Sequence, residues 1–203
     1  RGEARVDLND RVAISAGVFG NLRFGSESSF ELVRPVLTME VRGRRSRFLF
    51  GTLDTPRVSV EPGPDRTGPH GLLPPMQRET LAFDRPYEAG LQWLFKGSRL
   101  EHDMWLQWQR LNTPDHRERL DAGARLDWRW GGIFSSLLQT HVVHEGGQLY
   151  ASGPVRDSFV LASGIKLSRR AQPPCAPGLV CEKAIGWHDG WLEVVGLWSH
   201  YVA

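Results

Sequence analysis

The sequence has little lysine or cysteine and no long apolar run. These shortages bear on which partners, sites and membrane segments the chain can have. Only three of its 203 residues are lysines, so nearly all the basic charge is arginine, and the formal net charge is only +2. Such a small charge does not indicate a nucleic-acid partner. No stretch approaches the roughly 20 apolar residues that a membrane-spanning helix needs. The glycines of "GVFGNLRFG" lack the spacing of a nucleotide-binding loop, so no cofactor is predicted.

The only two cysteines, Cys175 and Cys181, flank the short stretch "CAPGLVC". A disulfide closing this loop is predicted, and it would place the chain in an oxidising compartment. A zinc site would need two further ligands, which the neighbouring residues do not supply. No metal site is predicted.

What the sequence does contain is two-residue alternation. In "RLDAGARLDWRW" (119–130) charged residues take nearly every odd position and apolar residues every even one. Successive side chains of a strand point to opposite faces, so this pattern predicts a strand with one polar and one apolar face. Related patterns predict nine strands in all: 11–19, 33–41, 46–53, 87–96, 99–109, 119–130, 133–143, 158–167 and 191–202.

Short and long connections alternate between these strands. "GRRS", "KGS" and "GG" are typical of tight hairpin turns. The longer links should lie together at the opposite end of the sheet. Residues 1–203 are therefore predicted to form one domain, with a long loop at 54–86 and a cysteine-containing loop at 168–185. Loop 54–86 is longer than a compact domain normally tolerates without a role.

Two all-β architectures fit such strands: a soluble β-sandwich that buries the apolar faces, and a transmembrane barrel that turns them to lipid. The aromatic residues favour the barrel, because they gather near the strand ends and leave aliphatic residues in the middle. Six lie at the short-turn end and two at the long-loop end. This predicted aromatic belt consists of Phe48, Phe50, Trp93, Phe95, Trp128 and Trp130, with Tyr87 and Trp108 at the other end.

In "YEAGLQWLFKGSRLEHDMWLQWQRL" and "RLDAGARLDWRWGGIFSSLLQTHVV" the chain resembles the bacterial outer-membrane β-barrel, or porin-like, class. The resemblance is one of architecture and covers roughly residues 11–167. It implies an up-and-down antiparallel barrel of which about 8–10 strands are visible, either whole or part of a larger one. It also implies a bacterial outer-membrane location, with short turns facing the periplasm and long loops facing outside. The long link 168–185 departs from this pattern.

The polar face supplies the candidate functional residues. If 99–109 and 119–130 are adjacent antiparallel strands, their acids and bases oppose one another across an inner wall. They would then cross-link the wall or line a channel. Trp105 on this face is either a stacking platform for a sugar or a ring that fills the interior. The predicted lumen-lining or binding residues are Glu101, Asp103, Trp105, Gln107, Arg119, Asp121, Arg125, Asp127 and Arg129.

The histidines and serines do not form a recognisable catalytic motif. His141 and His144 lie three apart, which places them on opposite faces of a strand. His102 lies beside two carboxylates that alternate away from it, so it is predicted to be a surface or interfacial residue. No nucleophile elbow is present, and no catalytic residue is predicted.

The sequence therefore predicts a non-enzymatic outer-membrane barrel that acts as a passive pore or a structural scaffold. Its partner would be the lipid bilayer, and other outer-membrane or periplasmic proteins are left open. One alternative is a soluble secreted or periplasmic all-β module that binds carbohydrate or protein. A second is a membrane-embedded lipid hydrolase.

Overall fold

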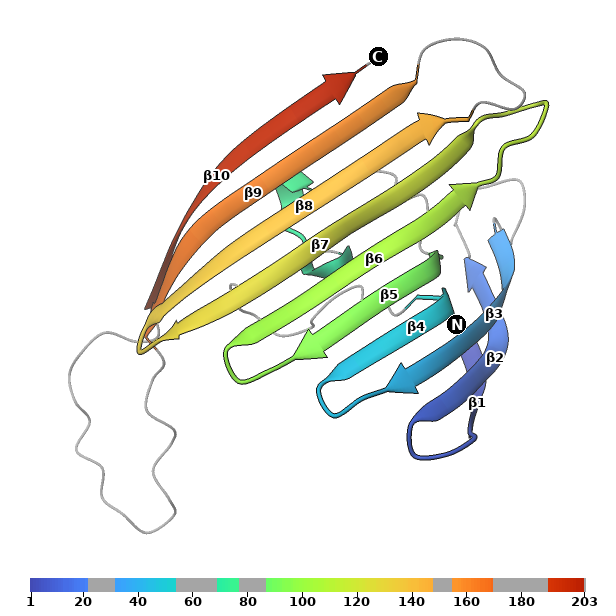
Figure 1. Cartoon of the computed structure of the whole chain (residues 1–203), viewed down its shortest axis with the longest axis horizontal. Helices are drawn as coiled ribbons and strands as arrows, with labels where there is room; N and C mark the ends of the chain where they lie inside the picture. The colour runs from blue at the N-terminus through green and yellow to red at the C-terminus, as the bar shows by residue number, and fades with distance from the viewer. Residues whose placement is uncertain (22–31, 54–68, 77–86, 148–154, 170–189, 203) are drawn as a thin grey trace.

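The structure is a computed structural model that describes residues 1–21, 32–53, 69–76, 87–147, 155–169 and 190–202. Ten antiparallel strands form one sheet in which each strand pairs with its neighbours in sequence (Figure 1). The fold is therefore all-β and up-and-down, as predicted, and the described strands form one sheet rather than a sandwich. The strands are β1 (Gly2–Asp7), β2 (Val12–Asn21), β3 (Leu32–Arg42), β4 (Ser46–Thr52), β5 (Ala89–Lys96), β6 (Leu100–Arg110), β7 (Glu118–Gly131), β8 (Phe134–Gly146), β9 (Arg156–Arg169) and β10 (Gly190–Val202).

The nine predicted strands are confirmed within a few residues at each end, and β1 is the one that the sequence analysis missed. Its six residues, GEARVD, are all exposed and carry no apolar run. Among the described residues β1 and β10 do not pair with each other, so the sheet is curved but not closed. In the same part of the chain no helix is long and apolar enough to cross a membrane.

The pairing of β6 with β7 sets which residues share a face. Trp105 lies opposite Gly123, Asp103 opposite Arg125, and Gln107 opposite Asp121. The assumed antiparallel pairing of these two strands is therefore confirmed. Because directly opposed residues point to the same side of a sheet, the polar residues of both strands share one face. We call this the inner face, and the opposite one the outer face.

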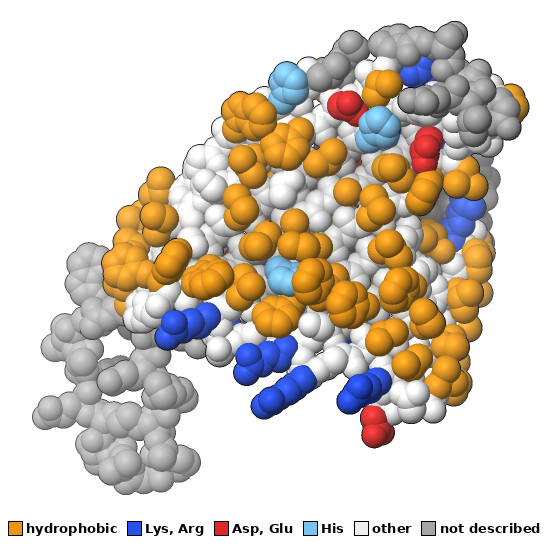
Figure 2. Space-filling view, in the orientation of Figure 1, with side chains coloured by type: hydrophobic (Ala, Val, Ile, Leu, Met, Phe, Trp, Pro, Cys, Tyr) orange, Lys and Arg blue, Asp and Glu red, His pale blue; other side chains and the backbone are white. Residues whose placement is uncertain are grey.

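The outer face is apolar and open to its surroundings. Large hydrophobic side chains stand on it along strand after strand, among them Leu37, Leu91, Ile165 and Val194, which are 47–66% exposed. Figure 2 shows hydrophobic side chains spread in groups over the whole of this face, with several lysine and arginine side chains along its lower edge. A water-soluble monomer rarely exposes an apolar patch of this extent. The outer face is therefore built to contact an apolar medium.

The inner face carries the hydrophobic core, and part of the long link between β4 and β5 supplies it. Two short 3-10 turns, η1 (Pro69–Gly71) and η2 (Pro74–Met76), lie against the sheet on this side (Figure 1). Leu72 and Met76, at most 1% exposed, pack with Trp105 and Ala162. Burying such side chains stabilises the arrangement by about 2 kcal/mol each. Residues 69–76, which we call the plug segment, therefore fill the concavity of the sheet.

Two further predictions have different outcomes. The predicted disulfide stays a prediction, because Cys175 and Cys181 lie outside the described residues. The aromatic belt residues on strands do lie on the outer face: Phe48, Phe50, Trp93, Trp108, Trp128 and Trp130 are 38–65% exposed, and Phe95 is half-buried beside His102. Tyr87 differs, because it precedes the first residue of β5 and so escapes the alternation. Its hydroxyl donates to the carbonyl of Pro35, and its ring lies against Phe19.

Candidate functional site

The plug segment presents one histidine to the sheet, and its backbone is unusual. His70 has φ 58° and ψ 12°, a left-handed conformation that non-glycine residues seldom adopt. Such a conformation costs about 1 kcal/mol and persists only where surrounding contacts impose it. Here the ring is fully buried and both of its nitrogens bind carboxylates. The local strain is therefore offset by the contacts of the side chain.

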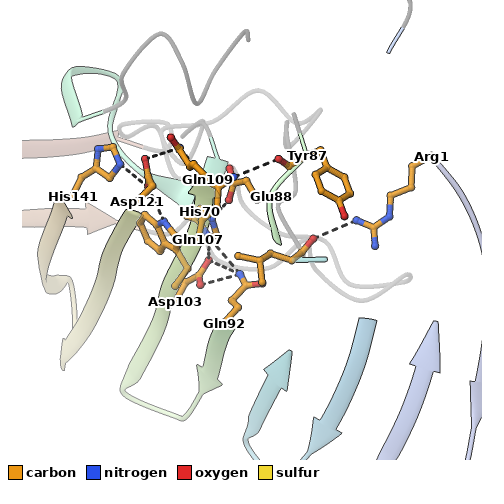
Figure 3. A network of polar contacts seen from close by, with 12 residues as sticks. Arg1, His70, Tyr87, Glu88, Gln92, Asp103, Gln107, Gln109, Asp121 and His141 are labelled. Carbon is orange, nitrogen blue, oxygen red and sulfur yellow. Dashed lines mark hydrogen bonds and ion pairs between the residues drawn. The ribbon is translucent and has the colours of Figure 1, made fainter. Parts of the chain in front are cut away.

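Those carboxylates come from two parts of the inner face (Figure 3). His70 Nε2 lies 2.6 Å from Oε2 of Glu88, just before β5. His70 Nδ1 lies 2.9 Å from Oδ2 of Asp103 on β6. The side-chain amide of Gln92 donates to both oxygens of Asp103, at 2.9 and 3.1 Å. We call this group of four residues the His70 centre.

The environment of His70 decides its charge. Burial alone lowers the pKa of the imidazole, because a cation is poorly solvated in the interior. Hydrogen bonds to Asp103 and Glu88, reinforced by their negative charges, outweigh burial and raise the pKa to about 9. At neutral pH the ring is therefore a cation that donates from both nitrogens. It stacks on the indole of Trp105 with ring centroids 3.9 Å apart and planes 2° apart, a geometry suited to a cation–π contact.

Trp105 connects the His70 centre to a second buried group. Its Nε1 donates to Oδ1 of Asp121 at 3.4 Å, and the same carboxylate oxygen lies 3.0 Å from Nε2 of His141. The side-chain amide of Gln109 donates to the other oxygen of Asp121 at 3.4 Å. Asp121 and His141 are at most 1% exposed. The two histidines and three carboxylates thus form one buried network across β5 to β8, seen together in Figure 3.

The plug segment is tied to the same wall by its backbone. The amide of Leu73 donates to Oε1 of Gln139 at 2.8 Å, and Nε2 of Gln139 donates to the carbonyl of Gly71 at 3.1 Å. Gly71 itself has φ +69° and lies against the guanidinium of Arg125. One glutamine therefore satisfies two backbone groups that would otherwise be buried without partners.

All nine predicted lumen-lining residues lie on the inner face, but they are not all paired as expected. Arg125 does bridge Glu101 at 3.2 Å and Asp127 at 3.0 Å, as an acid–base ladder requires. Asp103 and Asp121 instead bind histidines that the sequence analysis had not connected to them. Trp105 is 4% exposed and fills the interior, which is the second of its two predicted roles.

Sequence reasoning missed His70, Glu88 and His141 as parts of a site. His70 lies in the loop 54–86, whose unexpected length was the one signal available. Nothing in local spacing links it to Asp103, because 33 residues separate them. His141 was correctly placed on the opposite face from His144, but its partner Asp121 lies on another strand.

Other histidines lie on the outer face, among them His102 and His144. His102 is 5% exposed because the rings of Phe95 and Trp93 cover it, so it is not a surface residue, and its predicted interfacial place stays a prediction. His144 bonds Asp157 through Nδ1 at 2.6 Å, and both side chains are about half exposed. Within the described ranges, no cluster of His, Cys, Asp and Glu has the arrangement of a metal site.

These features define a class: an all-β protein with an apolar outer face and a buried histidine–carboxylate network on its inner face. The family model of the lipid A 3'-O-deacylase type matches residues 3–183. The chain therefore belongs to the lipid A 3'-O-deacylase-type family. Comparison with curated proteins and with solved structures finds no match.

Family membership corrects two predictions. A passive pore or scaffold is wrong, and so is the expectation that the chain is not an enzyme, because a deacylase-type family indicates a hydrolase. The physical reason for the error lies in the plug segment. Without this segment the inner face has the alternation of a charged wall. The segment brings His70 into contact with two of the carboxylates, Asp103 and Glu88.

Proposed function

We propose that this protein is an outer-membrane enzyme that hydrolyses the 3'-O-linked acyl ester of lipid A. The observation that carries the proposal is the family match, which spans nearly all of β1 to β9 and the plug segment. The apolar outer face supports a location in the bilayer, where the acyl chains of such a substrate lie. This function is the lipid-hydrolase alternative that the sequence analysis left open.

We assign the reaction to the His70 centre. Ester hydrolysis needs a group that accepts a proton from the attacking water and donors that stabilise the developing oxyanion. As a cation, His70 suits the second task, and it can protonate the departing sugar oxygen. Glu88, within 2.6 Å of its Nε2, supplies a carboxylate for the first task. Water adds to the ester carbonyl, the bond to the sugar oxygen breaks, and the products are a fatty acid and a sugar hydroxyl.

The centre is closed in this structure, because His70 and Glu88 are each 2% exposed. An ester reaches the imidazole only when the plug segment moves away from Trp105. Among the described residues, the contacts that hold it include the two hydrogen bonds of Gln139, the bonds of His70, and the packing of Leu72 and Met76.

The test is fatty-acid release from lipid A by the purified protein in detergent micelles, measured by mass spectrometry. Wild type should release one acyl chain and leave the remainder intact. His70→Gln should reduce the rate about 10²- to 10⁴-fold, the usual contribution of a general acid or base. The matched control is His144→Gln, because His144 also binds a carboxylate but lies on the outer face.

Each outcome has a separate meaning. If wild type releases no fatty acid from lipid A, the proposed function is wrong. If wild type is active and His70→Gln retains its rate while His144→Gln loses it, the enzyme is confirmed and its reaction centre lies at His144. Circular dichroism of each variant shows whether the strands have formed, so a loss of fold is recognised as such.

A further inference from the structure

A row of arginines crosses the inner face where the long links join the strands. Arg110 on β6 lies opposite Arg119 on β7, Arg119 opposite Glu145 on β8, and Glu145 opposite Arg156 on β9. Directly opposed residues point to the same side, so all four side chains share the inner face. We call these four residues the arginine row.

The arginine row has an excess of positive charge. Its one carboxylate, Glu145, accepts a hydrogen bond from Nη2 of Arg110 at 2.7 Å. The carboxylates nearest to it in sequence are engaged elsewhere or face away. Asp121 binds His141 and Gln109. Glu118 and Asp157 alternate to the outer face. On the described strands, the three guanidinium groups of the row therefore share a single acid on their own face.

Two donors in the arginine row are buried without an acceptor. Within the described part of the chain, Nε of Arg110 and Nε of Arg119 have no hydrogen-bond partner, although neither atom is open to solvent. Buried donors normally find partners, and a charged donor left without one is costly. An oxyanion with several acceptor oxygens would satisfy both. Arginine pairs bind phosphate in this way, through forked N–H donors.

We propose that Arg110, Arg119 and Arg156 form a phosphate-binding site that holds a phosphate group of lipid A. This inference rests on the proposed function and names the part of the substrate that is recognised. Lipid A is an acylated glucosamine disaccharide that carries phosphate. Arg119 lies on the same face of β7 as Asp121, which is two residues away and belongs to the buried network of His70. A phosphate held at the row therefore places the sugar next to the His70 centre.

The test measures binding rather than turnover, in octyl glucoside micelles that contain no phosphate detergent. Wild type is titrated with lipid A and with phosphatase-treated lipid A. We expect lipid A to bind at least 10-fold more tightly, and Arg119→Gln to reduce that preference to less than 3-fold. The matched control is Arg42→Gln on β3, which should keep the preference. Arg42 shares the buried Nε without a partner, but it lies outside the arginine row and forms an ion pair with Asp7.

A competition experiment distinguishes a site for the phosphate of lipid A from a site for free inorganic phosphate. Inorganic phosphate at millimolar concentration should weaken lipid A binding by wild type and have no effect on Arg119→Gln. If inorganic phosphate binds at the row but lipid A and its phosphatase-treated form bind equally, the row is a site for free phosphate and the proposal is overturned. It is also overturned if Arg42→Gln loses the preference as fully as Arg119→Gln.

The same titrations keep this proposal apart from the proposed function. A phosphate preference without fatty-acid release contradicts the deacylase function and leaves the phosphate site standing. Fatty-acid release by wild type without a phosphate preference contradicts only the phosphate site.

Discussion

At the scale of single residues, His70 does two things at once. Its ring links the plug segment to Glu88 and Asp103, and it carries the positive charge that makes burial of these carboxylates tolerable. Breaking such a pair by removing one partner is strongly destabilising, because the remaining charge is left buried. His70 therefore contributes to stability as well as to the proposed chemistry. Its contribution to stability can be measured on its own, through the pH dependence of unfolding.

The stability of the protein should depend on the charge of His70. Its pKa is about 9 in the folded chain against an ordinary value of 6.5 for histidine, so folding favours the protonated ring. The stabilisation is fully present below pH 6.5, falls as the pH rises through about 9, and amounts to about 3 kcal/mol. Denaturant unfolding in micelles at pH 6, 7.5 and 9.5 measures it. His70→Gln should lose less stability over this range than wild type, and an equal loss would contradict the assignment.

At the scale of elements, the pairing of β6 with β7 depends on the absence of a side chain at one position. Trp105 crosses the inner face over Gly123, its cross-strand partner. A Cβ at Gly123 would lie 2.4 Å from Cζ2 of Trp105 and 2.6 Å from the carbonyl oxygen of Thr140. The second contact is with backbone, which cannot move without disturbing β8. Gly123 is therefore what lets the indole lie flat between His70 and the sheet.

Gly123→Ala should destabilise the protein by about 2 kcal/mol, the usual cost of overpacking. It should also shift the tryptophan emission, because Trp105 is displaced from His70. The comparison is Gly196→Ala on β10, where the nearest atom to a Cβ is the carbonyl oxygen of Ser163 at 3.9 Å. That substitution should be neutral or stabilising by up to about 1 kcal/mol. Equal effects in denaturant unfolding would show that the indole is not clamped as described.

At the scale of the whole molecule, the sheet separates two environments. Its inner face buries a polar network under the plug segment, and its outer face exposes large apolar side chains. In water the outer face would drive aggregation, whereas in a bilayer it is matched to its surroundings. The proposed membrane location therefore predicts that a charged side chain introduced on the outer face destabilises the protein, and that the loss of stability depends on its depth in the bilayer.

Leu91→Arg and Ile133→Arg test that prediction. Both side chains are about equally exposed, at 47% and 46%, but Leu91 lies within β5, opposite Leu106 in the central part of β6, and Ile133 is in a short turn. In lipid vesicles Leu91→Arg should cost about 2–4 kcal/mol and Ile133→Arg about 0–1, because a charge is most costly at the bilayer midplane. Unfolding titrations in vesicles measure both. Similar small costs at the two positions would mean that the outer face does not contact lipid.

The sequence by itself determined the strands and their two faces. Alternation with period two is a local property, so the sequence predicted nine of the ten strands and, except for Tyr87, the face of each predicted residue. Even the opposite placement of His141 and His144 followed from this period. The charged inner wall was equally visible, but its function was not. Alternating acidic and basic side chains give the same sequence pattern whether the protein is a pore or an enzyme.

Only the tertiary structure decided what the inner wall binds. Folding of residues 69–76 against the sheet brings His70 to Asp103, and pairing of β7 with β8 brings Asp121 to His141. These contacts join residues 20 and 33 positions apart, and no local pattern specifies them. The plug segment has neither helical nor strand periodicity, because its place depends on the burial of Leu72 and Met76 in a concavity made by other strands. Local spacing therefore determined the sheet, and long-range burial determined the site.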